Sequence, residues 1–150
     1  MIDRPQVTIY SDGGSKPNPG RGGWAALLIY GDVTRELYGY DLQTTNNRME
    51  LTAAVMALEA LSRPCEVMFY IDSQYVRNGI TSWIKNWMKN GWKTAAKKPV
   101  ENQDLWKRLY EATQKHTIHW QWVRGHAGNH YNERVDQLAT AAREQRLTSP

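Results

Sequence analysis

Two acidic residues occupy matching places in this sequence. Asp12 follows the apolar run VTIYS, and Asp72 follows the apolar run VMFYI. If these runs form neighbouring parallel strands, both carboxylates emerge at one edge of a sheet, which is where open α/β sheets hold their sites. Clustered carboxylates repel one another and therefore need protons or cations. Their hard oxygen atoms favour Mg²⁺, with Mn²⁺ as a substitute, so the pattern predicts metal-dependent chemistry at this edge.

Two further acids and one histidine extend the pattern. Glu50 lies early in the helix-forming stretch NNRMELTAAVMALEAL, and Asp136 lies early in the expected last helix. His126 lies between glycines in the segment RGHAGN, just before that helix. In chain order the acids come from a strand, a helix, a strand and a helix. This order favours one site that several elements build together.

Each of these residues also has an ordinary structural explanation. Asp12 precedes a glycine and fits a turn, and Asp72 precedes a serine and fits a helix cap. Residues 47–50 fit a variant of the capping box, and Asp136 suits the positive end of a helix dipole. His126 fits a solvated loop. Taken singly, each of these residues fits a structural role as well as a catalytic one.

The elements that must position these side chains follow from the residue pattern. Three strand-like segments precede the first helix, and strands and helices then alternate, which predicts a mixed α/β sheet with helices on both faces. A two-residue turn, Gly31-Asp32, joins the second and third strands as a hairpin. The run at 67–71 is continuously apolar, as in a strand covered on both faces. The expected strands are 7–11, 24–30, 33–40, 67–71 and 117–123, and the expected helical segments are 46–61, 73–90, 103–113 and 132–146, all within one domain, 1–150.

The positive charge of the chain is concentrated in one window. The net charge is +4, but residues 73–100 contain six basic residues and no Asp or Glu. Such a local basic patch is typical of a polyanion partner. The segment SWIKNWMKNGWK also fits a helix with an aromatic core stripe and a solvated lysine face, and this alternative remains open. With one cysteine, no signal peptide and no apolar run of membrane-spanning length, the expected location is the cytoplasm.

Five segments together resemble the bacterial type 1 ribonucleases H. These segments are YSDGGSKPNPGRGGW, TTNNRMELTAAVMALEAL, IDSQYVRNGI, WIKNWMKNGWKTAAKKPVEN and VRGHAGNHYNERVDQLA. They follow the family's order from about residue 7 to residue 143. The resemblance implies the ribonuclease H-like fold, a five-stranded mixed sheet with three antiparallel strands and two parallel ones. It also implies an endonuclease that hydrolyses the RNA strand of RNA–DNA hybrids and leaves 5′-phosphate and 3′-hydroxyl ends.

The resemblance also implies a role for each candidate catalytic residue. Two Mg²⁺ ions roughly 4 Å apart would clamp the attacking and leaving oxygens. Asp12 would bridge both ions, Asp136 would help hold the ion that activates water, and Glu50 and Asp72 would help hold the ion near the leaving 3′ oxygen. His126 would assist proton transfer or product release.

The residues expected to contact the hybrid come from the same resemblance. The glycine-rich stretch 13–23 would be a bare loop that lets a nucleic-acid backbone approach, and short polar groups would reach the RNA 2′-hydroxyls. A basic protrusion at about 81–101 would grip the DNA strand. Gln43 stands where some relatives carry a basic residue, at a DNA phosphate pocket. The expected contacts are Gly13, Ser15, Asn18, Asn46, Asn47 and Gln74 for the hybrid, Trp83, Lys85, Lys89, Lys97 and Lys98 for the protrusion, and Thr45 and Asn102 for the phosphate pocket.

The expected partner is therefore an RNA–DNA hybrid duplex, bound by a monomer with no membrane association. Two rival functions remain: a hybrid-binding module without catalysis, and a nuclease of the same fold that acts on DNA. All four acids are present, which disfavours the first rival. The basic protrusion and the asparagine-rich segments disfavour the second.

Overall fold

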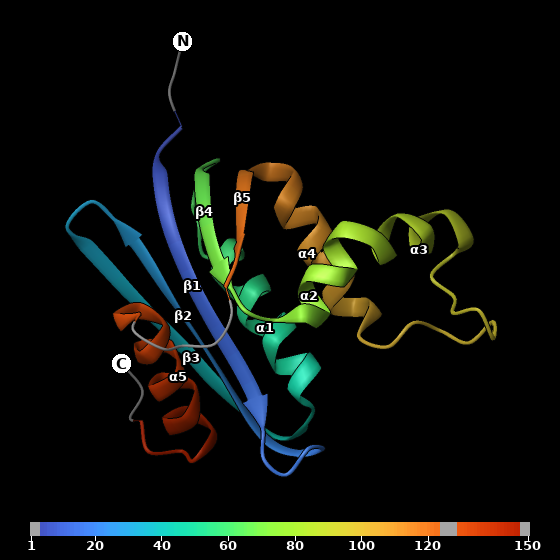
Figure 1. The fold of residues 1–150 in the computed structure, drawn as a ribbon, viewed down its shortest axis with the longest axis horizontal. Coiled ribbons are helices and arrows are strands. Elements are labelled where there is room, and N and C mark those ends of the chain that lie inside the picture. Colours follow the sequence, from blue (N-terminus) through green and yellow to red (C-terminus); the bar gives the residue numbers. More distant parts are fainter. Residues whose placement is uncertain (1–3, 124–128, 148–150) are drawn as a thin grey trace.

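A five-stranded mixed sheet forms the centre of the molecule, with strand order β3-β2-β1-β4-β5 (Figure 1). The computed structural model describes residues 4–123 and 129–147. β1, β2 and β3 pair antiparallel, and β1, β4 and β5 pair parallel, which confirms the predicted mixed sheet. The strands are β1 (Gln6–Ser15), β2 (Gly20–Tyr30), β3 (Val33–Thr44), β4 (Glu66–Ile71) and β5 (Thr117–Trp122).

Helices cover both faces of the sheet (Figure 1). On one face, Ile9 and Phe69 belong to a core that includes Leu51 and Trp106 from two different helices. On the other face, Tyr10 and Leu27 form a second core with Val135 and Leu138 of the last helix. Adjacent residues of β1 thus serve opposite faces, as the two-residue period of a strand requires. The helical elements are α1 (Asn46–Glu59), α2 (Gln74–Asn78), the π-helical turn η1 (Gly79–Trp83), α3 (Ile84–Asn90), α4 (Gln103–Lys115) and α5 (His130–Arg143).

β4 differs from its expected environment. Its residues alternate, with Val67, Phe69 and Ile71 buried and Met68 37% exposed, so the prediction of a strand covered on both faces is wrong. α5 packs against β1, β2 and β3, and the second face of β4 is left partly open. A short apolar run cannot reveal how far one helix extends over a sheet.

β1 is longer than predicted, and this changes the meaning of the glycine-rich stretch. The strand continues through Asp12 to Ser15 and pairs with residues 22–25 of β2. Much of the stretch is therefore strand, so the expectation of a bare loop at 13–23 is wrong. A Cβ on Gly23 would lie 2.3 Å from the carbonyl oxygen of Ala139 in α5, which shows that glycine here permits close packing of helix on sheet.

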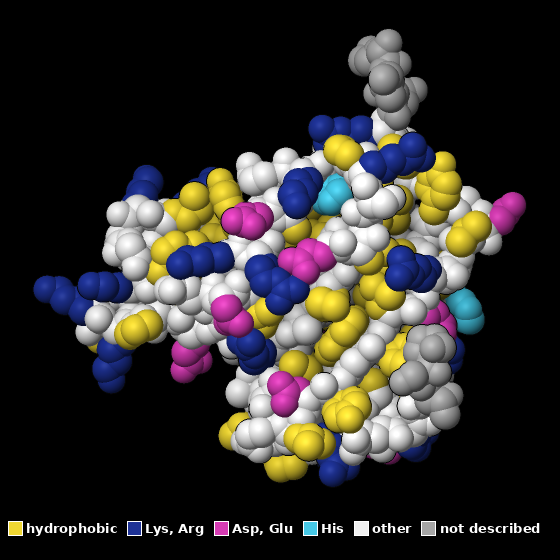
Figure 2. All heavy atoms as spheres, turned by 180° about the vertical axis from the view of Figure 1, so that it is seen from behind, with side chains coloured by type: hydrophobic (Ala, Val, Ile, Leu, Met, Phe, Trp, Pro, Cys, Tyr) yellow, Lys and Arg dark blue, Asp and Glu magenta, His cyan; other side chains and the backbone are white. Residues whose placement is uncertain are grey.

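The basic segment projects from the body of the molecule. η1, α3 and the following loop extend to one side (Figure 1), and Figure 2 shows Lys and Arg side chains gathered on this projecting part. Tryptophan rings connect it to the core: Trp83, Trp87 and the buried Trp106 follow one another at centroid distances of 5.8 and 5.5 Å. These ring contacts agree with the aromatic core stripe considered for this segment from the sequence. No helix within residues 4–123 and 129–147 is both long and apolar enough to cross a membrane.

Candidate active site

The carboxyl ends of β1 and β4 bring the first two acids together. Parallel pairing between these strands ends at Tyr10 and Tyr70, and Asp12 and Asp72 both lie two residues further on. The two strands run in the same direction, so both acids reach the same edge of the sheet, as predicted. Asp12 is held by the antiparallel strand β2, where it lies opposite Ala25, and the turn proposed for it is absent.

Asp12 lies among other carboxylates. Its pKa is raised to about 8, chiefly by burial and further by the negative charges of Asp72 and Asp136. The side chains of Asp12 and Asp136 also share a hydrogen bond. The Gly13 N–H donates to Asp12 Oδ1 at 2.9 Å, which opposes the upward shift. A carboxyl in this environment stays protonated near neutral pH unless a cation compensates its charge.

Glu50 joins the same group from the helix side. α1 begins with Thr45 as its N-cap, whose hydroxyl accepts a hydrogen bond from the Arg48 N–H. The predicted capping box at 47–50 is therefore wrong, and Glu50 is left with no capping role. The pKa of Glu50 is raised to about 6, chiefly by burial and also by the charge of Asp72, while the nearby Ser73 side chain lowers it.

Asp136 lies in the second turn of α5, because this helix begins at His130, earlier than expected. An acid so far from the helix N-terminus gains little from the dipole, which removes its structural explanation. The electrostatic interactions thus connect all four acids in the order Glu50, Asp72, Asp12 and Asp136, which come from α1, the residue after β4, β1 and α5.

The donor set fits a hard divalent cation. Within the described ranges, no three Asp, Glu, His or Cys side chains converge closely enough to hold a metal ion by themselves. Mg²⁺ does not need such a cage, because it keeps several waters and is commonly bound through one or two carboxylates plus substrate phosphates. Repelling carboxylates with raised pKa values are the arrangement that a cation stabilises on binding. His126 lies outside the described residues.

Three of the expected hybrid contacts form a connected group beside these acids. The Ser15 N–H donates to Asn46 Oδ1 at 2.6 Å, and the Ser15 hydroxyl donates to Asn18 Oδ1 at 3.1 Å. Asn18 Oδ1 also accepts from the Asn46 N–H at 3.1 Å. The segment between β1 and β2 is thus fixed to the start of α1. Gly13 lies against α1 as well, and Asn47 and Gln74 are exposed.

The expected phosphate pocket is organised by a residue that the sequence did not single out. Arg48 Nη1 donates to Asn102 Oδ1 at 3.1 Å, while the Arg48 backbone N–H donates to the Thr45 hydroxyl at 3.1 Å. Two further hydrogen bonds, at 3.1 and 2.8 Å, join the Arg48 guanidinium to Asp104. Arg48 therefore connects the two pocket residues across α1 and α4. Gln43, two residues before Thr45 at the end of β3, is exposed.

The residues expected in the protrusion divide between two grooves. Trp83, which is 37% exposed, lines one groove with Asn86 and Lys93. Lys85 lines a different groove, toward α4 and β5, and Lys89 borders both. Lys97 and Lys98 are exposed in the loop after α3.

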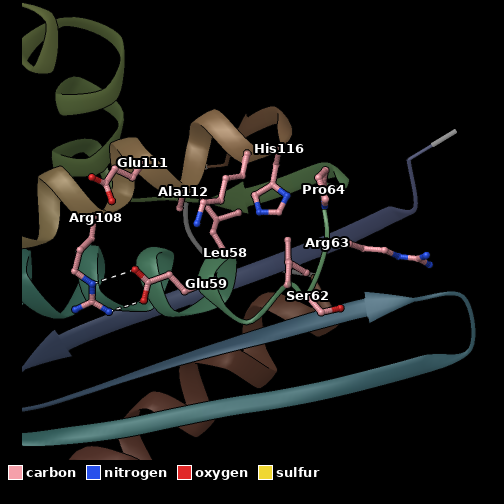
Figure 3. A pocket seen from close by; sticks show the side chains of 11 residues that line it. Leu58, Glu59, Ser62, Arg63, Pro64, Arg108, Glu111, Ala112 and His116 are labelled. Atoms are coloured by element: carbon pink, nitrogen blue, oxygen red, sulfur yellow. Dashed lines mark hydrogen bonds and ion pairs between the residues drawn. The ribbon is translucent and has the colours of Figure 1, made fainter. Parts of the chain in front are cut away.

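A separate hollow of about 320 Å³ lies between the C-terminal ends of α1 and α4 (Figure 3). Arg108 and Glu59 form an ion pair at its wall, with a nitrogen–oxygen distance of 2.6 Å. Pro64 and His116, which also line it, precede β4 and β5. The hollow therefore lies at the opposite edge of the sheet from the acids and takes no part in their site.

Comparisons with known proteins agree on one family. The family model described as RNase H matches residues 4–144. A ribonuclease H from Granulibacter bethesdensis is 61% identical over 137 residues, covering 91% of each chain. The solved structure of LC9-RNase H1, a type 1 RNase H with the type 2 active-site motif, superposes with a TM-score of 0.87 at 32% identity, covering 99% of this chain and 77% of that one. LC11-RNase H1, solved in complex with an RNA/DNA hybrid, shares the fold with a TM-score of 0.69 at 22% identity, covering 95% of this chain and 99% of that one.

Proposed function

The chain belongs to the ribonuclease H family, and we propose on that basis that it hydrolyses the RNA strand of RNA–DNA hybrids in a metal-dependent reaction. We further propose that two Mg²⁺ ions take part, that Mn²⁺ can replace them, and that the products carry 5′-phosphate and 3′-hydroxyl ends. The observation that carries the proposal is the group of four mutually interacting acids at one sheet edge.

The four acids are the residues that would hold the ions. Asp12 has Asp72 on one side and Asp136 on the other, which suits it to contact both ions, and Glu50 lies beside Asp72. When bound, the ions supply Lewis-acid stabilisation of the attacking and leaving oxygens in an in-line displacement. The protein's part is to keep Asp12 and Glu50 partly buried and ready to lose their protons when a cation binds. The Ser73 side chain lowers the pKa of Glu50 and so favours its ionised form.

The segment between β1 and β2 supports selection of the hybrid. Asn18, Asn46 and Ser15 restrain one another through hydrogen bonds, so polar groups are held in place beside the acids. A hybrid displays its RNA 2′-hydroxyls in a wide, shallow groove that such groups reach. The exposed lysines of the protrusion suit the phosphates of the DNA strand.

A strand-specific cleavage assay tests the proposal. An end-labelled RNA–DNA hybrid, duplex DNA and duplex RNA are each incubated with the protein, with Mg²⁺ or with a chelator. We expect cleavage of the RNA strand of the hybrid alone, and only with metal. Tight binding of the hybrid without cleavage would favour the non-catalytic module, and cleavage of duplex DNA would favour the DNA nuclease.

Removal of lysines from the protrusion is expected to weaken hybrid binding and its salt dependence. Each lost phosphate contact lowers the slope of log K against log salt by about 0.9, so replacing Lys85, Lys89, Lys97 and Lys98 by Ala flattens it in proportion to the contacts made. Binding is measured by titration without added metal at several salt concentrations.

The matched control compares two double variants. Lys97→Ala with Lys98→Ala removes two charges from the protrusion, and Arg63→Ala with Lys115→Ala removes two from the hollow at the far edge. We expect only the first pair to flatten the slope. If both double variants had the same slope of log K against log salt, the protrusion lysines would not be phosphate contacts and would serve only solubility.

A further inference from the structure

A small cavity adjoins the acids on the α5 side. Its volume is about 140 Å³, and Asp12, Asp136, Thr140 and Arg143 line it together with glycine backbone of β1 and β2. Binding pockets for drug-sized molecules typically measure about 300–1,000 Å³, so this cavity suits a single small group. Two acidic residues and one arginine thus belong to the same lining.

Arg143 makes a longer ion pair than three other arginines of this protein do. Arg48, Arg108 and Arg134 approach Asp104, Glu59 and Glu36 at 2.8, 2.6 and 2.7 Å.

By contrast, Arg143 Nη2 lies 3.7 Å from Glu144 Oε1, beyond hydrogen-bond distance, and Glu144 pairs with Arg146 at 3.1 Å. The Arg143 side chain is only 23% exposed. Within the part of the chain that the structure describes, its guanidinium donates no hydrogen bond, so a half-buried group with five donors is left to bind something else.

The position of Arg143 relative to the acids is fixed by the backbone. A Cβ on Gly23 would lie 2.5 Å from the Arg143 backbone nitrogen, so α5 rests directly on β2 at this point. Asp136, Thr140 and Arg143 have the spacing of one helix face, at i, i+4 and i+7. The Thr140 hydroxyl makes no hydrogen bond to another described residue and is a second polar group at the cavity.

We propose that Arg143, assisted by Thr140, binds a phosphate of the RNA strand next to the phosphate that is cleaved; this rests on the proposed function. The guanidinium is planar and presents its donors in a fork that matches phosphate oxygens. Arg143 is then a positioning residue, which places the strand against the acids without touching the reacting atoms.

The test combines a protein variant with a modified substrate. Arg143→Gln removes the charge, and hybrids with one neutral methylphosphonate linkage, on either side of the cleavage site in turn, remove one phosphate charge. With the unmodified hybrid, Arg143→Gln is expected to raise KM about tenfold with kcat within about twofold, and to lower the salt slope of binding by about one.

Cross-comparison identifies the phosphate. At one of the two positions, the neutral linkage is expected to weaken the wild type about tenfold and Arg143→Gln hardly at all. Arg143→Lys keeps the charge without the planar fork, so the neutral linkage is expected to weaken this variant less than the wild type and more than Arg143→Gln. Arg146→Gln is the control, since Arg146 is exposed, on the same segment and paired with Glu144, and it is expected to behave as the wild type.

The inference would be overturned if the neutral linkage, at both positions, weakened the wild type and Arg143→Gln equally. It would also be overturned if Arg143→Gln had the KM of the wild type for the unmodified hybrid. Failure of the wild type to cleave any hybrid would instead overturn the proposed function, so the two failures are distinguishable.

Discussion

Asp12→Asn is expected to abolish hybrid cleavage and, at the same time, to make the metal-free protein more stable. The pKa of Asp12 rises from 3.8 to about 8 on folding because the side chain is buried beside two other acids. The folded protein therefore binds this proton more tightly than the unfolded chain does. Asparagine keeps the oxygen that accepts from the Gly13 N–H and removes the charge.

The sign of the pH dependence follows from this shift. Below pH 4, Asp12 is protonated in both states and does not favour either. As the pH rises from about 4 to 8, the unfolded chain loses the proton and the folded protein retains it unfavourably, so the free energy of unfolding falls. Each pKa unit corresponds to about 1.4 kcal/mol, but the shift belongs to the coupled acids together, so only part of it is relieved by one substitution. We therefore expect the free energy of unfolding of Asp12→Asn to exceed that of the wild type by about 2 kcal/mol at pH 8 and by little at pH 4.

Denaturant unfolding at several pH values, with and without Mg²⁺, measures this effect. Mg²⁺ is expected to stabilise the wild type more than Asp12→Asn, since it binds the ionised acids. It should therefore reduce the difference in free energy of unfolding between the two proteins. Asp32→Asn, in the exposed hairpin turn, is the matched control and is expected to change neither stability nor cleavage. Hybrid binding by Asp12→Asn is expected to persist. Full cleavage by this variant would remove Asp12 from the site.

The sequence was informative where one local rule determines position. The apolar runs before Asp12 and Asp72 predicted two parallel strands, and parallel strands must deliver their following residues to one edge. The hairpin at Gly31 was equally local: its φ of +58° favours glycine, and Tyr30 pairs with Val33 across it. The same rule accounts for Asp12 and Asp72 alone; the site roles of Glu50 and Asp136 came from the resemblance to the ribonuclease H family.

The sequence was uninformative where a residue's role depends on a distant partner. Glu50 fitted a capping box that starts at Asn47, whereas in the structure Thr45 is the N-cap of α1. Arg48 resembled any helix arginine, and only the packing of α1 against α4 brings it to Asn102. Arg143 likewise has no motif of its own. The role proposed for it rests on its long, 3.7 Å ion pair with Glu144 and on its place in the lining of the small cavity.

Gly13 is another residue whose role depends on a distant partner, because it lies against the backbone of α1. Gly13→Ala is expected to lower both stability and cleavage. A Cβ at Gly13 would lie 2.4 Å from the Met49 carbonyl oxygen and 2.8 Å from the Glu50 backbone nitrogen. Both contacts are with helix backbone, which cannot rotate away, so α1 must move from β1. Glu50 moves with it, away from the acids on the sheet.

Gly14→Ala is the matched control for this substitution. A Cβ there would meet only the side-chain oxygen of Asn46, at 3.3 Å, and a side chain adjusts more easily than a helix. We expect Gly13→Ala to lose about 2–3 kcal/mol of unfolding free energy and at least about tenfold in kcat, and Gly14→Ala to lose under about 1 kcal/mol. Thermal unfolding without substrate separates this displacement from a steric clash with the hybrid. If Gly13→Ala kept its stability but lost cleavage, the glycine would serve substrate approach; if it kept both, the close packing of α1 on β1 would not be what positions Glu50.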